Sequence, residues 1–450
     1  MARRPHDHEG RDGHESGAHR GHGEHHHAED PAPEPRSLTK PSTVGGPVFA
    51  QPEPTPDPTQ FAVRHASDRE AYRRIDALNR EHRLAPMPFP PPRGGAEPRL
   101  TLADVLGGEQ EAQEIIAAIE AAGRLVFHTV GDTGSTRGPE TQNRVADKMT
   151  SDFDDADPTD APRFFLHLGD VVYSFGEAAY YYDQFYEPYR DYPAPIIAIA
   201  GNHDGMVAPE TGAKTLAAFL ENFCQQHFVV TPEAGGLSRT AQIEPGVFFT
   251  FEAPFLRVLA LYSNTLEDPG VIADERIGDS QLHFLEAALR RVNEEKFQGA
   301  VVIAHHHPVY VADSQHGGSP QMGEQIDEIC EEVGVWPHAV LAGHAHNYQR
   351  FTRRRGGTEI PYLIAGNGGH GLARLSRRGK VLRTPSIIHA ADDGSDEITL
   401  ENYDDRDYGY LRAIASAETL RFEYHPSSDG PYAKTPDDVV TVVLASRTLA

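Results

Sequence analysis

Short apolar runs alternate with amphipathic or polar stretches over most of the chain. The runs at 125–127, 164–166 and 339–341 are rich in Leu, Val and Phe and are too short for helices, which is typical of buried strands. Residues 115–122 and 282–292 instead place apolar side chains at helical spacing. Strands separated by helices predict βαβ units and mixed sheets in a protein of the α/β class.

The pattern changes in two later regions. Residues 237–261 contain short strand-like runs with turns between them and no long helix. The runs at 362–364 and 420–423 are interpreted as closing strands, and the polar, charged segment 371–406 between them as long surface loops.

Changes in composition predict three parts of the chain. Residues 1–60 hold Gly, Pro, acidic and His residues with few large apolar side chains, which predicts a disordered tail. Residues 61–95 form an arm, in which the capping-box pattern at 67–70 begins a helix that ends before Pro86 and is followed by a proline-rich connector. Residues 96–450 are predicted to form the catalytic domain.

Charge and cysteine content exclude several classes of protein. The chain of 450 residues has a formal net charge of −26, which disfavours binding to nucleic-acid phosphates. Cys224 and Cys330 are too few for a disulfide framework and are expected to be buried free thiols. No apolar run reaches the length of a membrane span, and no apolar segment follows Arg3 and Arg4, so we expect a cytoplasmic protein that does not bind membranes.

Five short polar motifs directly follow apolar runs, at 131–134, 169–173, 201–204, 305–308 and 343–346. Side chains placed just beyond the carboxyl ends of parallel strands meet at one edge of a sheet. Together the motifs offer carboxylates, a phenol, an amide and several imidazoles, without a thiolate. This set suits two hard-to-borderline divalent or trivalent ions that share a bridging carboxylate, which we interpret as Asp170.

These five motifs, in this order, resemble those of the metallophosphoesterase superfamily, and within it the purple acid phosphatase-like branch. The match spans Gly131 to His346, roughly half of the chain. The resemblance implies a four-layer α/β/β/α sandwich with two mixed sheets, which periodicity alone does not separate from a doubly wound sheet. Most superfamily members begin with Asp-x-His, whereas this chain has Gly134 two residues after Asp132, and Tyr173 is expected to replace the lost ligand.

The resemblance also implies the ligands of two metal ions. The first ion would be held by Asp132, Asp170, Tyr173 and His346, and the second by Asp170, Asn202, His344 and one histidine of the triple. The family's His-x-Pro pattern selects His306, whereas counting from Val302 selects His305. The fixed distance to Pro308 favours His306. The ions would be Fe, Mn or Zn, or a mixed pair. A Tyr ligand favours ferric iron, and a reducing cytosol favours Mn or Zn.

Catalytic roles follow from the same resemblance. A metal-bound hydroxide would attack phosphorus in line, and His203 would serve the leaving oxygen or the transition-state oxyanion. Asp204 would orient the His203 ring, or alternatively cap a turn. His316 would face the substrate.

Other polar residues have weaker support. His307 is expected either to face substrate or to pack against Pro308, and Asn264 and Asn367 lie in loops that could approach the site. The remaining histidines considered are interpreted as structural or exposed: His128, His167, His283 and His370.

The leading functional hypothesis is a binuclear metal-dependent hydrolase of small phosphate monoesters. A phosphodiesterase or nucleotide hydrolase on the same metal core is the alternative enzyme, because specificity lies in loops. An alternative of another class is a metal-binding or storage protein that uses the histidines of the tail, namely His6, His8, His14, His19, His22, His25, His26 and His27.

Overall fold

A computed structural model of the chain describes residues 42–50, 68–81, 83–154, 157–207, 212–313, 315–376 and 381–450. The predicted disordered tail at 1–60 and its histidines lie outside these residues, apart from 42–50. The hypothesis of a metal-storing tail therefore falls on residues that the structure does not describe.

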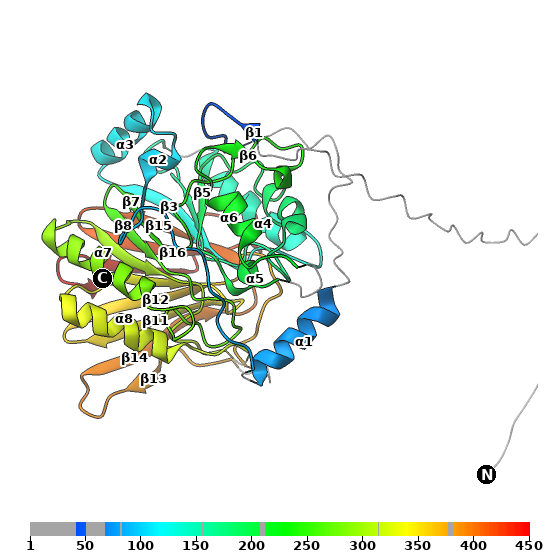
Figure 1. The fold of residues 1–450 in the computed structure, drawn as a ribbon. Helices are drawn as coiled ribbons and strands as arrows, with labels where there is room; N and C mark the ends of the chain where they lie inside the picture. Colours follow the sequence, from blue (N-terminus) through cyan, green and yellow to red (C-terminus); the bar gives the residue numbers. More distant parts are fainter. Residues whose placement is uncertain are drawn as a thin grey trace, which may run out of the picture. The chain divides into compact units, whose positions relative to one another are not determined.

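Two large sheets organise the described residues (Figure 1). The nine-stranded sheet has the order β13 (Ser386–Ala390), β14 (Asp396–Asp404), β11 (Tyr348–Arg355), β12 (Thr358–Ala365), β10 (Ala339–Ala342), β9 (Ala300–Ala304), β8 (Leu256–Ala260), β7 (Phe249–Ala253) and β2 (Arg99–Thr101). The seven-stranded sheet has the order β18 (Thr448–Leu449), β17 (Asp438–Val443), β16 (Thr419–Pro426), β15 (Gly409–Ala415), β3 (Leu125–Val130), β4 (Phe165–His167) and β5 (Ile196–Ala198). Both sheets contain parallel and antiparallel pairs. A short pair, β1 (Ser42–Thr43) with β6 (Val229–Val230), lies outside them.

The two sheets pack face to face, and helices cover their outer faces. Phe127 of β3, Phe251 of β7 and Val258 of β8 belong to one buried cluster between the sheets. The rings of Phe164 and Phe251 lie 4.8 Å apart across it. The outer faces are covered by α4 (Glu140–Thr150) and α6 (Ala217–Phe223) on one side and by α7 (Ser280–Glu294) and α8 (Pro320–Val333) on the other. This is the predicted α/β/β/α sandwich.

Several predicted helices are confirmed where their sequence signals are strongest. Helix α1 (Asp68–Arg80) begins within the capping-box pattern. Helix α3 (Gln110–Ala122) ends at Gly123, whose φ of 66° is the left-handed conformation common after a helix. The remaining described α-helices are short, α2 (Leu102–Val105) and α5 (Asn202–Gly205). Among the described residues, no helix combines the length and hydropathy needed to cross a bilayer.

The prediction of surface loops at 371–406 is wrong for much of that segment. It contains β13 and β14, which extend the nine-stranded sheet. The charges that suggested a loop are instead paired across strands. Asp396 of β14 binds Arg353 of β11 with an N–O distance of 3.0 Å, while Ile398 and Leu400 are buried. Cross-strand ion pairs allow a strand to be rich in charge.

The two cysteines agree with the prediction. Cys224 and Cys330 are both buried and free. Burial raises the pKa of the Cys330 thiol to about 12, so the thiol is neutral at physiological pH.

Candidate metal centre

The motifs predicted from the sequence meet where the strands of both sheets end. β3, β4 and β5 are neighbouring parallel strands, and their carboxyl ends lead to Asp132, Asp170 and Asn202. β9 and β10 are neighbouring parallel strands of the other sheet, and they lead to His306 and His344. Parallel pairing puts the carboxyl ends of adjacent strands at one edge, which explains how residues distant in sequence come together.

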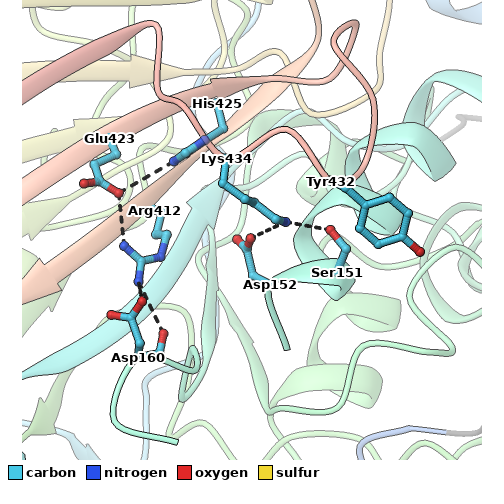
Figure 2. A pocket seen from close by; sticks show the side chains of 8 residues that line it. All are labelled: Ser151, Asp152, Asp160, Arg412, Glu423, His425, Tyr432 and Lys434. Atoms are coloured by element: carbon cyan, nitrogen blue, oxygen red, sulfur yellow. Dashed lines mark hydrogen bonds and ion pairs between the residues drawn. The ribbon is translucent and has the colours of Figure 1, made fainter. Parts of the chain in front are cut away.

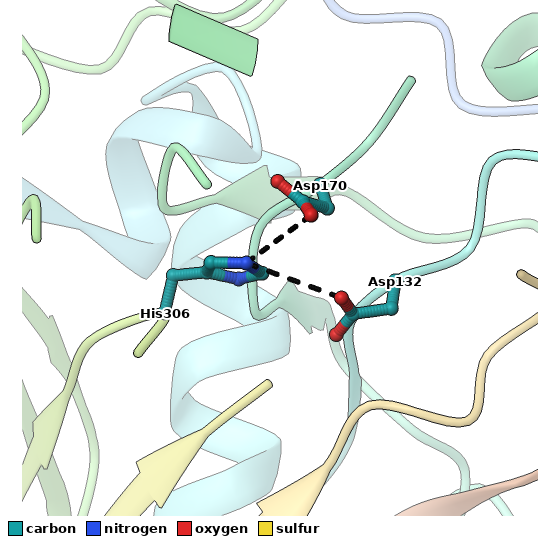
Figure 3. Close-up of side chains that lie close together, drawn as sticks. All are labelled: Asp132, Asp170 and His306. Carbon is teal, nitrogen blue, oxygen red and sulfur yellow. Dashed lines mark ion pairs between the residues drawn. The ribbon is translucent and has the colours of Figure 1, made fainter. Parts of the chain in front are cut away.

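Asp132, Asp170 and His306 form the centre of the site (Figure 3). One ligand atom from each lies within 4.8 Å of the others, and all three residues are buried. The His306 Nε2 atom is 3.2 Å from Asp170 Oδ2 and 3.9 Å from Asp132 Oδ1. The group contains Asp132, which was predicted to bind the first ion, and His306, which was predicted to bind the second. It also contains Asp170, which was predicted to bind both.

The hydrogen bonds of His306 define its tautomer. Its Nδ1 atom lies 2.7 Å from the carbonyl oxygen of Leu168, which can only accept a hydrogen bond. Nδ1 therefore carries a hydrogen, and Nε2 is the ring nitrogen that faces the two carboxylates. A backbone carbonyl on the far nitrogen is the usual support of a metal-binding histidine.

Buried polar atoms without partners gather around this group. Within the described part of the chain, Asp170 Oδ2, His306 Nε2, His344 Nε2 and both side-chain atoms of Asn202 are buried without a hydrogen bond. Such atoms are costly to bury unless another group satisfies them. Their chemistry, carboxylate and amide oxygen with imidazole nitrogen, fits a cation.

Backbone conformation at the site is unusual in the same way at three places. Asp132, Asp170 and His344 have φ values of 56°, 54° and 68°. Non-glycine residues in this left-handed region are uncommon and tend to occur at functional sites. The neighbouring backbone also comes close. A Cβ atom on Gly343 would lie 2.6 Å from Asp132 Oδ2, and one on Gly201 would overlap the Asp170 carboxylate. These loops therefore fix the two carboxylates tightly.

Tyr173 and His346 extend the site beside Asp132. The Tyr173 hydroxyl donates to Asp132 Oδ1 at 2.8 Å and lies 3.2 Å from His346 Nε2. His346 Nε2 is itself 3.4 Å from Asp132 Oδ1. The structure therefore brings together the residues predicted for the first ion.

The predicted second set is also assembled around the centre. The His344 backbone N–H donates to Asp132 Oδ2 at 2.7 Å, and its ring centroid lies 5.2 Å from that of His306. Asn202 is fully buried at the start of α5. The next residue, His203, donates its backbone N–H to Asp170 Oδ1 at 2.9 Å, which holds this turn beside Asp170.

The electrostatic surroundings shift several pKa values. Burial would lower the pKa of His306, but the charges of Asp170 and Asp132 raise it to about 10. Burial holds the pKa of His344 well below its ordinary value, which leaves that imidazole neutral, as a metal ligand must be. Burial and the charge of Asp170 raise the pKa of Asp204 to about 7.

The prediction that Asp204 orients His203 is wrong. The His203 Nδ1 atom instead donates to the Ser174 carbonyl at 2.7 Å. Asp204 accepts hydrogen bonds from backbone N–H groups of Val171 at 3.0 Å and Gly201 at 2.8 Å. It therefore ties the loop that carries Asp170 to the loop that carries Asn202, which is closer to the alternative role of a turn cap.

The structure also places the remaining candidates. His316 lies at the site, with its ring centroid 4.9 Å from that of His344, and its Nδ1 atom is 3.2 Å from Asp313 Oδ2. His307 is 4.2 Å from His344 by ring centroids, but both of its nitrogens are engaged, by Ser263 and by the Leu266 carbonyl. It is therefore held by protein groups.

Within the described structure, three further candidates do not belong to the group of Asp132, Asp170 and His306. Asn264 binds the backbone of Met87, and Asn367 binds Tyr424 and the Asp407 carbonyl. His305 is buried, and neither of its ring nitrogens has a hydrogen bond to any residue that the structure describes.

A small cavity of about 60 Å³ opens on the centre, and some of the residues that line it were not predicted from the sequence. Beside predicted residues, its lining includes Tyr72 of α1, Glu267 and His370. The His370 ring stacks on Tyr173 at 3.7 Å, although the sequence had suggested a structural or exposed residue. None of these three belongs to a motif, so only the fold could reveal them.

A second cavity, of about 360 Å³, has a different character (Figure 2). Lys434 and Arg412 line it, but each is already paired. Lys434 Nζ is 2.5 Å from Asp152 Oδ1, and Arg412 lies 2.8 Å from Asp160 and 3.0 Å from Glu423. These cations are neutralised within the cavity, so it does not offer an open anion site.

Comparisons with known proteins point to a phosphoesterase family. Residues 125–348 match the model of a family described as calcineurin-like phosphoesterase. The chain is 22% identical, over 377 residues, to the "Probable inactive purple acid phosphatase 9" of Arabidopsis thaliana, covering 77% of this chain and 54% of that protein. The chain thus spans about half the length of the curated relative it matches.

Among solved structures, the fold is similar to GAP50 of Plasmodium, with 13% identity, a TM-score of 0.46, and coverage of 71% of this chain and 88% of that one. It is also similar to PhoD, with 12% identity, a TM-score of 0.42, and coverage of 73% and 71%. A dimetal phosphatase from Danio rerio has 11% identity, a TM-score of 0.40, and coverage of 71% and 99%.

Proposed function

Because the chain belongs to the calcineurin-like phosphoesterase family, we propose that it hydrolyses small phosphate monoesters with two metal ions that share Asp170. The position of Asp170 carries this proposal. Its Oδ1 atom is fixed by the His203 N–H at 2.9 Å, while Oδ2 has no hydrogen bond among the described residues and lies 3.2 Å from His306. One carboxylate thus borders both predicted ligand sets.

The residues that would hold the ions form two sets that share Asp170. Asp132, Tyr173 and His346 are in mutual contact on one side, and His306, His344 and Asn202 supply the remaining donors. Bound divalent ions would supply Lewis acidity, activating a water molecule and offsetting the charge of the phosphoryl group. Iron, manganese or zinc suits these oxygen and nitrogen donors.

His203 is suited to serve the leaving oxygen. Its Nδ1–H is committed to the Ser174 carbonyl, so Nε2 is the atom available to substrate. That nitrogen lies 4.0 Å from Asp170 Oδ2 and 3.8 Å from Glu267 Oε1. A proton held there can pass to the ester oxygen as the bond to phosphorus breaks.

His316 would bind a phosphoryl oxygen or the ester group. Burial lowers its pKa, but the hydrogen bond and charge of Asp313 outweigh this and raise it. A charged imidazole at this position would favour a dianionic phosphate.

Parallel assays on p-nitrophenyl phosphate and bis(p-nitrophenyl) phosphate test the proposal. We expect the monoester to be hydrolysed much faster, and we expect dialysis against a chelator to abolish turnover until Mn, Zn or Fe is restored. Hydrolysis of the diester alone would favour the phosphodiesterase alternative. Failure to hydrolyse either ester with any of these metals would overturn the proposal. This outcome is worth testing because the name of the curated relative contains the word "inactive".

A further inference from the structure

Helix α1 forms one wall of a larger cavity beside the candidate metal centre. This cavity has a volume of about 640 Å³ and is bounded by α1 and by the loops that carry Glu267 and His316. Tyr72, Glu267 and His316 also line the small cavity at the centre. The two cavities therefore share a border, and a ligand with its phosphate at the centre can extend into the larger one.

Tyr72 fixes the helix at this border. Its hydroxyl donates to Glu267 Oε1 at 2.9 Å, across 195 residues of sequence. Its ring lies 5.3 Å from the ring of His203, the proposed proton donor, at an interplanar angle of 38°. Figure 1 shows α1 beside α5, the helix that contains His203. Tyr72 is thus positioned next to the atoms that would leave with the alcohol.

Carboxylates outnumber cationic side chains in the lining of the larger cavity. Asp76, Glu267 and Asp268 line it together with Arg80 and His316, and the guanidinium of Arg80 is ion-paired with Asp76. Burial and the charge of Glu267 raise the pKa of Asp76, while Arg80 and His203 lower it. The carboxylates thus repel one another, and a cation between them would relieve that repulsion.

The border also reaches a residue assigned to the second metal ion. His344 is 1% exposed, and within the described structure its Nε2 atom has no hydrogen bond. It lines the small cavity and lies 3.4 Å from Asp268 Oδ1, which belongs to the wall of the larger one. The acidic wall therefore begins directly beside the proposed phosphate site.

We propose that the larger cavity receives the alcohol part of the substrate and selects a phosphate monoester whose alcohol carries an ammonium group. This inference rests on the proposed function. The carboxylates of Glu267 and Asp76 would attract the ammonium group, and the Tyr72 ring adds a cation–π face. A second phosphate or a carboxylate on the alcohol would be repelled. Hydrolysis consumes one water, breaks the bond between phosphorus and the ester oxygen, protonates that oxygen, and releases an amino alcohol and inorganic phosphate.

Kinetics on isosteric esters test the selection. 2-Aminoethyl phosphate and n-propyl phosphate differ only by an ammonium group in place of a methyl group. For the full chain we expect kcat/KM to favour the amino ester by about tenfold, as ion pairs and cation–π contacts at partly exposed sites allow. Glu267→Gln and Asp76→Asn should reduce this ratio several-fold. Glu81→Gln, just beyond α1 in an exposed ion pair with Arg83, is the matched control and should leave the ratio unchanged.

A binding measurement separates this inference from the proposed function. Calorimetry on the metal-loaded chain compares 2-aminoethylphosphonate with n-propylphosphonate, neither of which is hydrolysed. Tighter binding of the amino compound, weakened by Glu267→Gln, supports the inference even if no ester is turned over. Equal binding of the two phosphonates, or binding of neither, overturns it, even if both esters are hydrolysed.

Discussion

The Tyr173 hydroxyl donates to the Asp132 carboxylate at 2.8 Å, and Gly134 provides the room for this arrangement. A Cβ atom on Gly134 would lie 2.7 Å from the Val171 carbonyl oxygen and would overlap the Gln184 amide. A histidine therefore cannot occupy the position that an Asp-x-His motif gives it. The aromatic side chain of Tyr173 reaches Asp132 from the neighbouring loop instead.

Replacing Tyr173 by Phe tests this substitution of ligands. The ring would still stack on His370, so we expect an intact fold by circular dichroism. Loss of the oxygen beside Asp132 and His346 should lower metal affinity or turnover by at least about tenfold. If the native ion is ferric, a phenolate-to-iron absorption band should also vanish. Unchanged metal content and unchanged rates would make Tyr173 a packing residue only.

Gly134→Ala should destabilise the fold. Its added methyl group would meet backbone and amide oxygens that cannot move away cheaply, which should lower the free energy of unfolding by about 1–3 kcal/mol. Gly45→Ala is the control, because no atom of the described residues lies within 4 Å of a Cβ atom built there. Denaturant titrations of both variants measure the difference. Equal stability would show that the loop yields easily.

His203→Ala separates mechanism from structure. Both ions should stay bound, because we assign His203 to the leaving group. Proton donation of this kind is worth about 10²–10⁴ in rate, so alkyl esters should lose most of their turnover. A p-nitrophenyl ester should lose less, because its leaving group departs as an anion. Equal losses would assign His203 to the oxyanion, and loss of an ion would show that it supports the metal centre.

The cavity in Figure 2 predicts a dependence of stability on pH. Burial would raise the pKa of Glu423, but His425, Arg421 and Arg412 outweigh it and lower the value to about 2. A carboxyl group whose pKa is lowered by folding stabilises the fold at every pH above its pKa in the unfolded chain, which is 4.5 for Glu423. This stabilisation is lost as the pH falls toward the folded-state pKa of about 2. Glu423→Gln should therefore be less stable than the native chain by about 1–2 kcal/mol near neutral pH. Thermal melts at falling pH should show this difference shrinking, and a constant difference would exclude the ion pairs as its cause.

The centre could be predicted from the sequence because each motif directly follows an apolar run. Asp132, Asp170 and His306 each lie just past a strand, and parallel pairing then brings them to one edge. The role of Asp204 could not be predicted in this way. Its neighbour in sequence is His203, but its hydrogen-bond partner at Val171 comes from another loop.

The contact between Tyr72 and Glu267 could not be predicted from sequence patterns either. They meet across 195 residues and belong to no motif, so only the packing of α1 brings them together. Strand β14 was missed because its charges suggested a loop, whereas the arginines of β11 neutralise them.

The bridging role of Asp170 is the central claim, and metal content tests it most directly. Bound metal per chain is measured by mass spectrometry for the native protein, for Asp170→Asn, and for Asp393→Asn, an exposed control that removes the same charge. Metal bound elsewhere on the chain contributes equally to all three measurements, so the difference from the native chain reports on the candidate centre. We expect Asp170→Asn to lose one or both ions, with turnover lower by several orders of magnitude, and Asp393→Asn to match the native chain. Native metal content with near-native turnover in Asp170→Asn would show that Asp170 is not the bridge.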